Sequence, residues 1–206
     1  MKTSKGVKFT RIMCAQFISV NVAQAQPLMA GGRKILSAIG KRGVAGSLQV
    51  GKLGLAGDEQ ADLSVHGGLE KAVYAYPVEH YAFWRAARRE FGVSMFDEDL
   101  PHGFMGENLT ISGLLEAEVF VGDELVFANC RLRVEAPREP CFKFAAVMGF
   151  AQAGKLMVQE ARCGFYLSVV ETGSLQAGEG FTHIAGARRL SIADAIRGKM
   201  AKHRRD

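Results

Sequence analysis

The chain has 206 residues, of which 48% are hydrophobic and 23% are charged, and this size suits one domain with a sizeable core. Its formal net charge of +5 suits anionic ligands, but a basic C-terminal tail supplies much of the excess, so we expect no nucleic-acid binding. No stretch offers the roughly 20 uncharged apolar residues of a membrane helix, so we expect no membrane span.

The N-terminal stretch MKTSKGVKFTRIMCAQFISVNVAQAQ admits two interpretations. Basic residues, an apolar middle and an Ala-Gln-Ala segment imitate a signal peptide with its cleavage site. Against this, Arg11, Gln16 and Asn21 interrupt the apolar run, and FISVNV is typical of a β-branched strand. We therefore expect a strand here, an N-terminal extension over residues 1–16, and a cytoplasmic protein.

Further strands are predicted where apolar runs end at glycine, proline, asparagine or aspartate. In chain order, these runs are GSLQVGKLGL, KAVYAYP, NLTIS, ELVFANCRLRVEAP and GFYLSVVETG. Within residues 125–135, one set of alternating positions is apolar, namely Val126, Ala128, Cys130, Leu132 and Val134. This period of two predicts a single strand with Cys130 facing the core as a buried, inert thiol.

Three helices are expected among these strands. The stretch YPVEHYAFWRAARREFG has Pro77 in its first turn, places Tyr81, Trp84 and Phe91 on one side, and stops at Gly92. Shorter helices are predicted at FAAVMGFAQAGK and at SIADAIRGKMAKH, where Ser and Asp have capping-box spacing. The pattern as a whole indicates a mainly β, β-rich α+β fold with a few peripheral helices.

Two glycine-containing turns could carry polar chemistry. In GDEQADLSVHGGLEKAVYAY, His66 precedes Gly67 and Gly68, and Lys71 follows, so backbone N–H groups and a cation could meet an anion. A plain glycine turn with His66 at the surface explains the same residues. In GFMGENLTISGL, Glu107 and Asn108 follow a glycine, and this polar pair could bond a ligand or simply satisfy its own turn.

The stretch VEAPREPCFKF presents a cysteine after two prolines. The chain has four cysteines, with neither a C-x-x-C pair nor zinc-finger spacing, so at least one thiol is expected to be free. Pro137 and Pro140 restrict the backbone, so that Cys141 leaves the strand in a defined direction. Arg138 and Lys143 flank this thiol, and nearby cations favour the nucleophilic, metal-binding thiolate form. A packed, unreactive thiol remains the alternative.

Together the motifs GDEQADLSVHGG, GENL and PREPC, in this order, resemble the MOSC domain, which is named after the C-terminal part of molybdenum cofactor sulfurases. The resemblance is to the small stand-alone YiiM-like bacterial proteins and covers residues 17–185, followed by a short C-terminal helix and basic tail over 186–206. It implies a MOSC-type β-barrel that binds a molybdenum cofactor (molybdopterin). It also implies reduction of N-hydroxylated compounds with electrons from a separate flavin reductase.

The resemblance also implies roles for particular residues. Cys141 takes the position of the molybdenum ligand, because it alone occupies the P-x-x-P-C position. Catalytic roles are expected for Cys141, His66 and Asn108. Cofactor binding is expected for the residues matching the family's other motif positions, Lys41, His66, Gly67, Gly68, Lys71 and Arg138. The loops bearing His66, Asn108 and Cys141 should then converge on one cleft.

The chain also departs from the family's pattern. Leu69 and Glu70 stand where a proline and an acidic residue commonly follow the two glycines, and Phe142 stands where a tryptophan often follows the cysteine. YiiM-like proteins usually carry a three-helix C-terminal extension, of which this sequence has about one helix. The alternative to an enzyme is a carrier of molybdenum cofactor or sulfur that uses Cys141 without turnover.

Overall fold

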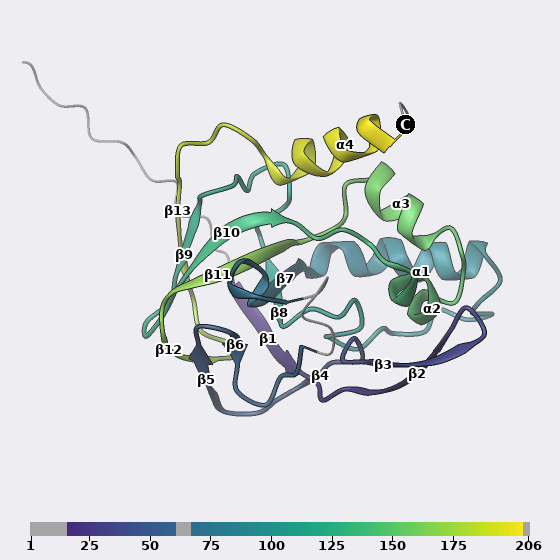
Figure 1. The fold of residues 1–206 in the computed structure, drawn as a ribbon, viewed down its shortest axis with the longest axis horizontal. Helices are drawn as coiled ribbons and strands as arrows, with labels where there is room; N and C mark the ends of the chain where they lie inside the picture. The colour runs from purple at the N-terminus through teal and green to yellow at the C-terminus, as the bar shows by residue number, and fades with distance from the viewer. Residues whose placement is uncertain (1–15, 61–66, 204–206) are drawn as a thin grey trace, which may run out of the picture.

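The computed structural model describes residues 16–60 and 67–203. Strands dominate, and the helices gather at one end and along one side of the largest sheet (Figure 1). This confirms the mainly β, β-rich α+β fold expected from the sequence. Within the described residues, no helix is long and apolar enough to cross a membrane.

The largest sheet is mixed and has eight strands. Their spatial order is β13 (Thr182–Ile184), β9 (Glu124–Val126), β10 (Arg131–Pro137), β11 (Phe165–Glu171), β7 (Val73–Pro77), β8 (Leu109–Ser112), β1 (Gln16–Val22) and β4 (Arg42–Gly43). Strands β7 and β8 pair in parallel, whereas the other neighbours are antiparallel. All of β7 is buried, because it lies between β8 and β11 and is covered on both faces.

The sheet curls but does not close into a barrel. The Phe17 N–H donates to the Glu179 carbonyl (3.3 Å), and the Gly178 N–H donates to the Phe17 carbonyl (2.7 Å), so β1 meets the segment that leads into β13. The two-residue strand β4 shares this same edge of β1. Because only short segments meet there, the described strands form no continuous closing ladder, so the expected β-rich fold is confirmed as a curled sheet in which no closed barrel is found.

Two smaller sheets flank the large one. One contains β12 (Gly173–Gln176), β5 (Ser47–Gly51) and β6 (Gly54–Leu55), and the other is the hairpin of β2 (Gln26–Ala30) and β3 (Arg33–Ser37). Within the described parts of the chain, the strands lie between residues 16 and 184. The division into an extension, a domain over 17–185 and a C-terminal helix stays a prediction.

The single strand predicted over 125–135 is in fact the two strands β9 and β10. The Phe127 N–H donates to the Cys130 carbonyl oxygen (3.0 Å), which closes a turn between them. The turn shifts the alternation, so Phe127 is buried, whereas Val126 is half-buried and Ala128 is exposed, against our expectation. Cys130 is buried as predicted, and burial raises the pKa of its thiol to about 12.

The first long helix begins later than predicted. A 3₁₀ turn, η2 (Val78–His80), follows Pro77, and α1 (Tyr81–Glu90) comes after it. Tyr81 and Trp84 are buried as expected, but Phe91 lies beyond the helix end, where its ring stacks on Phe150 with centroids 4.4 Å apart.

The helix predicted after Cys141 is two helices, α2 (Phe142–Met148) and α3 (Ala153–Gln159). Gly149 ends α2, because its left-handed backbone (φ 82°) does not continue the helix. A Cβ at this position would also lie only 2.6 Å from Val93 Cγ1, which favours glycine here. The last helix is α4 (Ile192–His203), and the Ser191 hydroxyl accepts from the Asp194 N–H (3.0 Å), as the capping pattern predicted.

Candidate functional site

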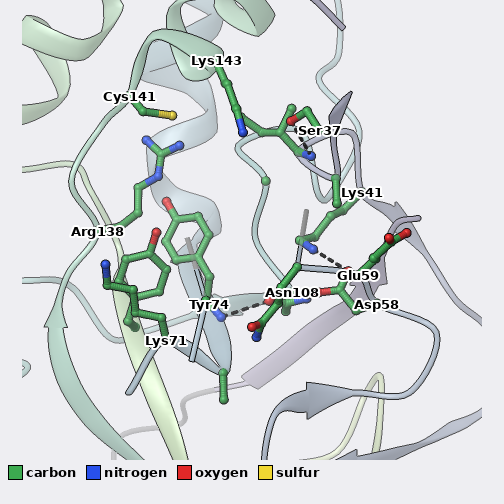
Figure 2. A pocket seen from close by; sticks show the side chains of 17 residues that line it. Ser37, Lys41, Asp58, Glu59, Lys71, Tyr74, Asn108, Arg138, Cys141 and Lys143 are labelled. Carbon is green, nitrogen blue, oxygen red and sulfur yellow. Dashed lines mark hydrogen bonds and ion pairs between the residues drawn. The ribbon is translucent and has the colours of Figure 1, made fainter. Parts of the chain in front are cut away.

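A cavity of about 120 Å³ lies beside β7 and is lined by residues from distant parts of the chain (Figure 2). Most of the residues singled out from the sequence line it, namely Lys41, Gly67, Lys71, Asn108, Arg138 and Cys141. Gly68 directly follows Gly67, and His66 lies outside the described residues. The structure thus brings the Asn108 and Cys141 loops together as predicted, while the roles of these residues stay predictions.

Cys141 stands between β10 and α2 and faces the cavity. Its backbone is extended (φ −120°, ψ 172°), and its carbonyl accepts the Phe144 N–H (3.0 Å) as α2 begins. Pro137 ends β10, and Pro140 precedes the cysteine, so the turn has little freedom. The thiol is partly exposed, unlike the buried Cys130.

Arg138, which lies three residues before Cys141 in the chain, is a buried cation. Its guanidinium carbon lies 5.7 Å from the ring centroid of Tyr74 and 4.7 Å from that of Phe144. Its Nη1 donates to the Met157 sulfur (3.4 Å). Among the described residues no carboxylate pairs with Arg138, so its charge favours an anion at the cavity, whether thiolate or ligand.

Two lysines complete this side of the cavity. Lys71 ends the 3₁₀ turn η1 (Leu69–Lys71), and its Nζ lies 5.8 Å from the Tyr166 ring centroid. The Gly68 N–H donates to Gln60 Oε1 (3.0 Å), which fixes the turn before η1. Lys143 enters from the first turn of α2. We call Lys71, Arg138, Cys141 and Lys143 the thiol wall.

The opposite side of the cavity holds Lys41, Asp58, Glu59 and Asn108, which we call the carboxylate wall (Figure 2). Lys41 Nζ and Asp58 Oδ1 form an ion pair whose side chains are each 8% exposed. Asp58 also accepts the Ala23 N–H at Oδ1 (2.9 Å). The Lys41 charge is therefore compensated within the protein.

Both polar atoms of the Asn108 side chain form hydrogen bonds within the protein. Its side-chain oxygen accepts the Tyr74 N–H (3.1 Å), and its amide nitrogen donates to Asp58 Oδ2 (2.8 Å) and to the Asn21 carbonyl (3.2 Å). These bonds orient Asp58 and join β7 to β1. They favour a positioning role over the direct catalytic role expected for Asn108.

Glu107, beside Asn108, is fully buried under the carboxylate wall. Its carboxylate accepts hydrogen bonds from the Tyr81 hydroxyl, the Thr110 hydroxyl (2.8 Å), the Gly103 N–H (2.8 Å) and the Met105 N–H (3.1 Å). Burial raises the pKa of this carboxyl above its ordinary value. Glu107 thus fixes the loop over residues 103–106 through hydrogen bonds from its buried side and is not among the residues that line the cavity.

The same loop packs tightly against the segment that carries Lys41. Gly103 has a φ of 88°, and a Cβ there would lie 2.6 Å from the Lys41 carbonyl oxygen. At Gly106, a Cβ would lie 2.8 Å from Ile39 Cγ1. Both glycines have a positive φ that disfavours other residues, and a side chain at Gly103 would also displace the Lys41 backbone, whereas one at Gly106 would meet the Ile39 side chain.

A family model for the MOSC domain matches residues 62–182, which is more than half of the chain. The chain belongs to the MOSC domain family. This result confirms the family suggested by the three motifs.

Named relatives support a YiiM-like MOSC protein. The chain is 35% identical to the uncharacterized protein YflK of Bacillus subtilis (strain 168) over 87% of this chain and 78% of that protein. It is 34% identical to protein YiiM of Escherichia coli (strain K12), over 77% and 69% of the two chains. A protein named "Reductase" from Gibberella moniliformis is 34% identical over 72% of this chain, which corresponds to 26% of the fungal protein.

Solved structures agree with the fold of this MOSC chain. YiiM from Geobacillus stearothermophilus superposes with a TM-score of 0.70 at 30% identity, covering 93% of this chain and 86% of that chain. YiiM from Escherichia coli superposes with a TM-score of 0.63 at 24% identity, covering 89% and 75%, which supports the fold alone.

The donor atoms of the MOSC site suit a metal that brings other ligands with it. Among the described residues, no group of three or more His, Cys, Asp or Glu side chains could hold a bare metal ion. The thiol wall offers one soft sulfur ligand beside three cations. A molybdenum centre that carries its own sulfur ligands and a phosphate group fits this donor set.

Several residues that line the cavity were not predicted from the sequence. Asp58 stands inside the GDEQADLSVHGG motif, where its acidic side chain and neighbouring glycine were a usable signal. Tyr74 and Tyr166 lie on predicted strands, but they reach the cavity because β7 and β11 pair with these two residues opposite each other. That pairing between distant strands has no signal in the local sequence.

Proposed function

We propose that this protein binds a molybdenum cofactor through Cys141 and reduces N–O bonds in N-hydroxylated compounds, with electrons from a separate flavin reductase. Candidate substrates are hydroxylaminopurine-type base analogues, hydroxylamines and amidoximes. The observation that carries the proposal is the thiol wall, which sets a partly exposed cysteine beside three cations in one cavity. Membership of a family named after molybdenum cofactor sulfurases supports the same chemistry, as does the relative named as a reductase.

Different residues of the thiol wall would bind different parts of the cofactor. Cys141 would ligate molybdenum as a thiolate, because a soft anionic sulfur suits this metal. Arg138, Lys71 and Lys143 would hold the anionic phosphate. When bound, the cofactor supplies two-electron redox chemistry, and the protein orients it and tunes the metal. The aromatic contacts of Arg138 keep this cation in place.

Turnover of loaded protein tests the proposal. Protein purified from a host that makes the cofactor should contain molybdenum by elemental analysis and pterin by fluorescence. With reduced viologen as an artificial donor, it should convert a hydroxylamine or an amidoxime to the amine or amidine. Protein that contains both molybdenum and pterin but does not turn over would instead be a carrier of cofactor or sulfur.

A further inference from the structure

The carboxylate wall holds a lysine whose expected role does not fit its surroundings. Lys41 was expected to bind the cofactor, as a cation for phosphate. Its ammonium is already paired with Asp58, and Glu59 adds a second negative charge to the same wall. This wall therefore carries no surplus positive charge for a phosphate, whereas the thiol wall opposite carries three cations.

The geometry leaves Lys41 able to serve a ligand as a donor. One N–H of its ammonium is used by Asp58, and among the described residues its Nζ has no other hydrogen-bond partner. Figure 2 shows this nitrogen at the cavity, across from Cys141 and Arg138. The two remaining N–H groups can therefore reach a group bound between the walls.

Asp58 is itself held, so the lysine has a defined position. Its Oδ1 accepts the Ala23 N–H (2.9 Å), and its Oδ2 accepts the Asn108 amide (2.8 Å). Gly103 allows the loop over 103–106 to pack against the Lys41 carbonyl. A nearly buried lysine fixed at both its backbone and its ammonium is suited to proton transfer at one place.

We infer that Lys41, held by Asp58, donates the proton that leaves with oxygen when the N–O bond breaks. The inference rests on the proposed reductase function and assigns the proton donor within the same site. Reduction of R–NH–OH consumes two electrons and two protons and gives R–NH₂ and water. The electrons come from the reduced enzyme, one proton passes from Lys41 to the departing oxygen, and the other reaches nitrogen from solvent. Solvent then reprotonates the Lys41 amine.

The electrostatics of the site agree with an acid role. Burial lowers the pKa of Lys41 below its ordinary value of 10.5, while Asp58 and the more distant Glu107 oppose this shift. The ammonium is therefore a stronger acid than that of a surface lysine, yet its partner carboxylate favours the charged form. Among the residues that the structure describes, the other charged groups lining the cavity are Glu59 beside it and Lys71, Arg138 and Lys143 on the thiol wall.

Two substitutions at Lys41 separate proton donation from charge. Lys41→Arg keeps the positive charge and can still pair with Asp58, but a guanidinium does not release its proton in this pH range. Lys41→Met removes both the charge and the proton. If Lys41 donates the proton, both variants should lower kcat/KM by about 10²-fold or more, with molybdenum and pterin contents unchanged. Lys155→Met, at an exposed position on α3, is the matched control and should keep the wild-type rate.

The pH profile gives a second kinetic result. A proton donor must be charged, so wild-type kcat/KM should fall as pH rises through the pKa of Lys41, at a pH below 10.5. This alkaline fall should be absent from the residual activity of both Lys41 variants. Equal profiles in wild type and variants would contradict the inference, as would Lys41→Arg with an activity within about threefold of wild type.

A measurement without cofactor completes the test. Lysine side-chain NMR of cofactor-free protein, assigned by loss of one signal in Lys41→Arg, should show Lys41 deprotonating at a pH below 10.5. Titration of Lys41 at 10.5 or above would overturn the acid role. Loaded wild-type protein that reduces no N-hydroxylated compound would overturn the proposed function, and with it this assignment, even if the NMR shift is found.

Discussion

The thiol wall and the carboxylate wall face each other across one cavity, and they use charge in different ways. On the thiol wall, Arg138 is held by aromatic rings and by Met157, and no carboxylate pairs with it among the described residues. On the carboxylate wall, Lys41 and Asp58 neutralise each other. A charge that is stabilised by ring faces remains available to a ligand, whereas a charge in an ion pair mainly fixes geometry.

The side chains packed behind the two walls also differ in polarity. The thiol wall is backed by apolar side chains such as Phe144, which is fully buried. The carboxylate wall is backed by buried polar groups, because Asn108 bonds to Asp58 and Glu107 bonds to four donors. Such a network tolerates little change, since each lost partner leaves a buried polar atom unsatisfied.

The largest effect is expected at the thiol itself. Cys141→Ser keeps nearly the same volume but replaces a soft ligand by a hydroxyl that is not ionised near neutral pH, so N–O reduction should fall by orders of magnitude. The melting temperature should hardly change, because the side chain is partly exposed. Wild-type-like reduction by Cys141→Ser at equal molybdenum occupancy would leave the thiol wall with no metal-binding role.

The next effect concerns stability and the carboxylate wall. Glu107→Gln places an amide group where four donors point, so the free energy of unfolding should fall by about 3 kcal/mol in urea titrations. Glu90→Gln, exposed at the end of α1, is the matched control and should stay within about 0.5 kcal/mol of wild type.

The pH dependence of stability sharpens the same prediction. Because burial raises the pKa of Glu107 above 4.5, the folded protein binds this proton more tightly than the unfolded chain does. The corresponding part of the stability is present at low pH and is lost as pH rises through the folded-state pKa. Glu107→Gln should lack this loss when unfolding is measured across the acidic range.

A smaller effect is expected from the cation beside the thiol. In cofactor-free protein, Arg138→Gln should lower the thiolate fraction of Cys141 and slow its alkylation near pH 7 by about tenfold. Arg89→Gln, on the exposed side of α1, should leave the rate unchanged. Cys130 and Cys163 are buried and should react only on unfolding. Faster labelling of Cys130 than of Cys141 would reverse the assignment of the two thiols.

The smallest effect is expected at Lys143. One of three cations is removed in Lys143→Gln, so inorganic phosphate should bind cofactor-free protein about threefold more weakly by calorimetry, with the difference shrinking as salt rises. Lys155→Gln serves as the control. An unchanged affinity in Lys143→Gln would mean that Arg138 and Lys71 alone make the thiol wall cationic.

The sequence predicts the thiol wall better than the carboxylate wall. The position of Cys141 follows from local rules, because two prolines and flanking cations act over a few residues. The compensation of Lys41 by Asp58 depends instead on how β1, β7 and β8 pair, and this pairing joins segments far apart in the chain. The turn between β9 and β10 was also missed, since continuous alternation concealed a hairpin at Asn129.

The central position of β7 in the large sheet affects the order in which the parts of the cavity form during folding. The walls are complete only when β8 and β11 have paired with β7, and β11 comes late in the chain. Such non-local pairing is slow compared with helix formation, and a nascent chain that ends before Tyr166 lacks both β11 and the tyrosine that it contributes to the cavity. The complete cavity therefore forms only after the chain extends past β11, although both walls are already encoded by residue 143.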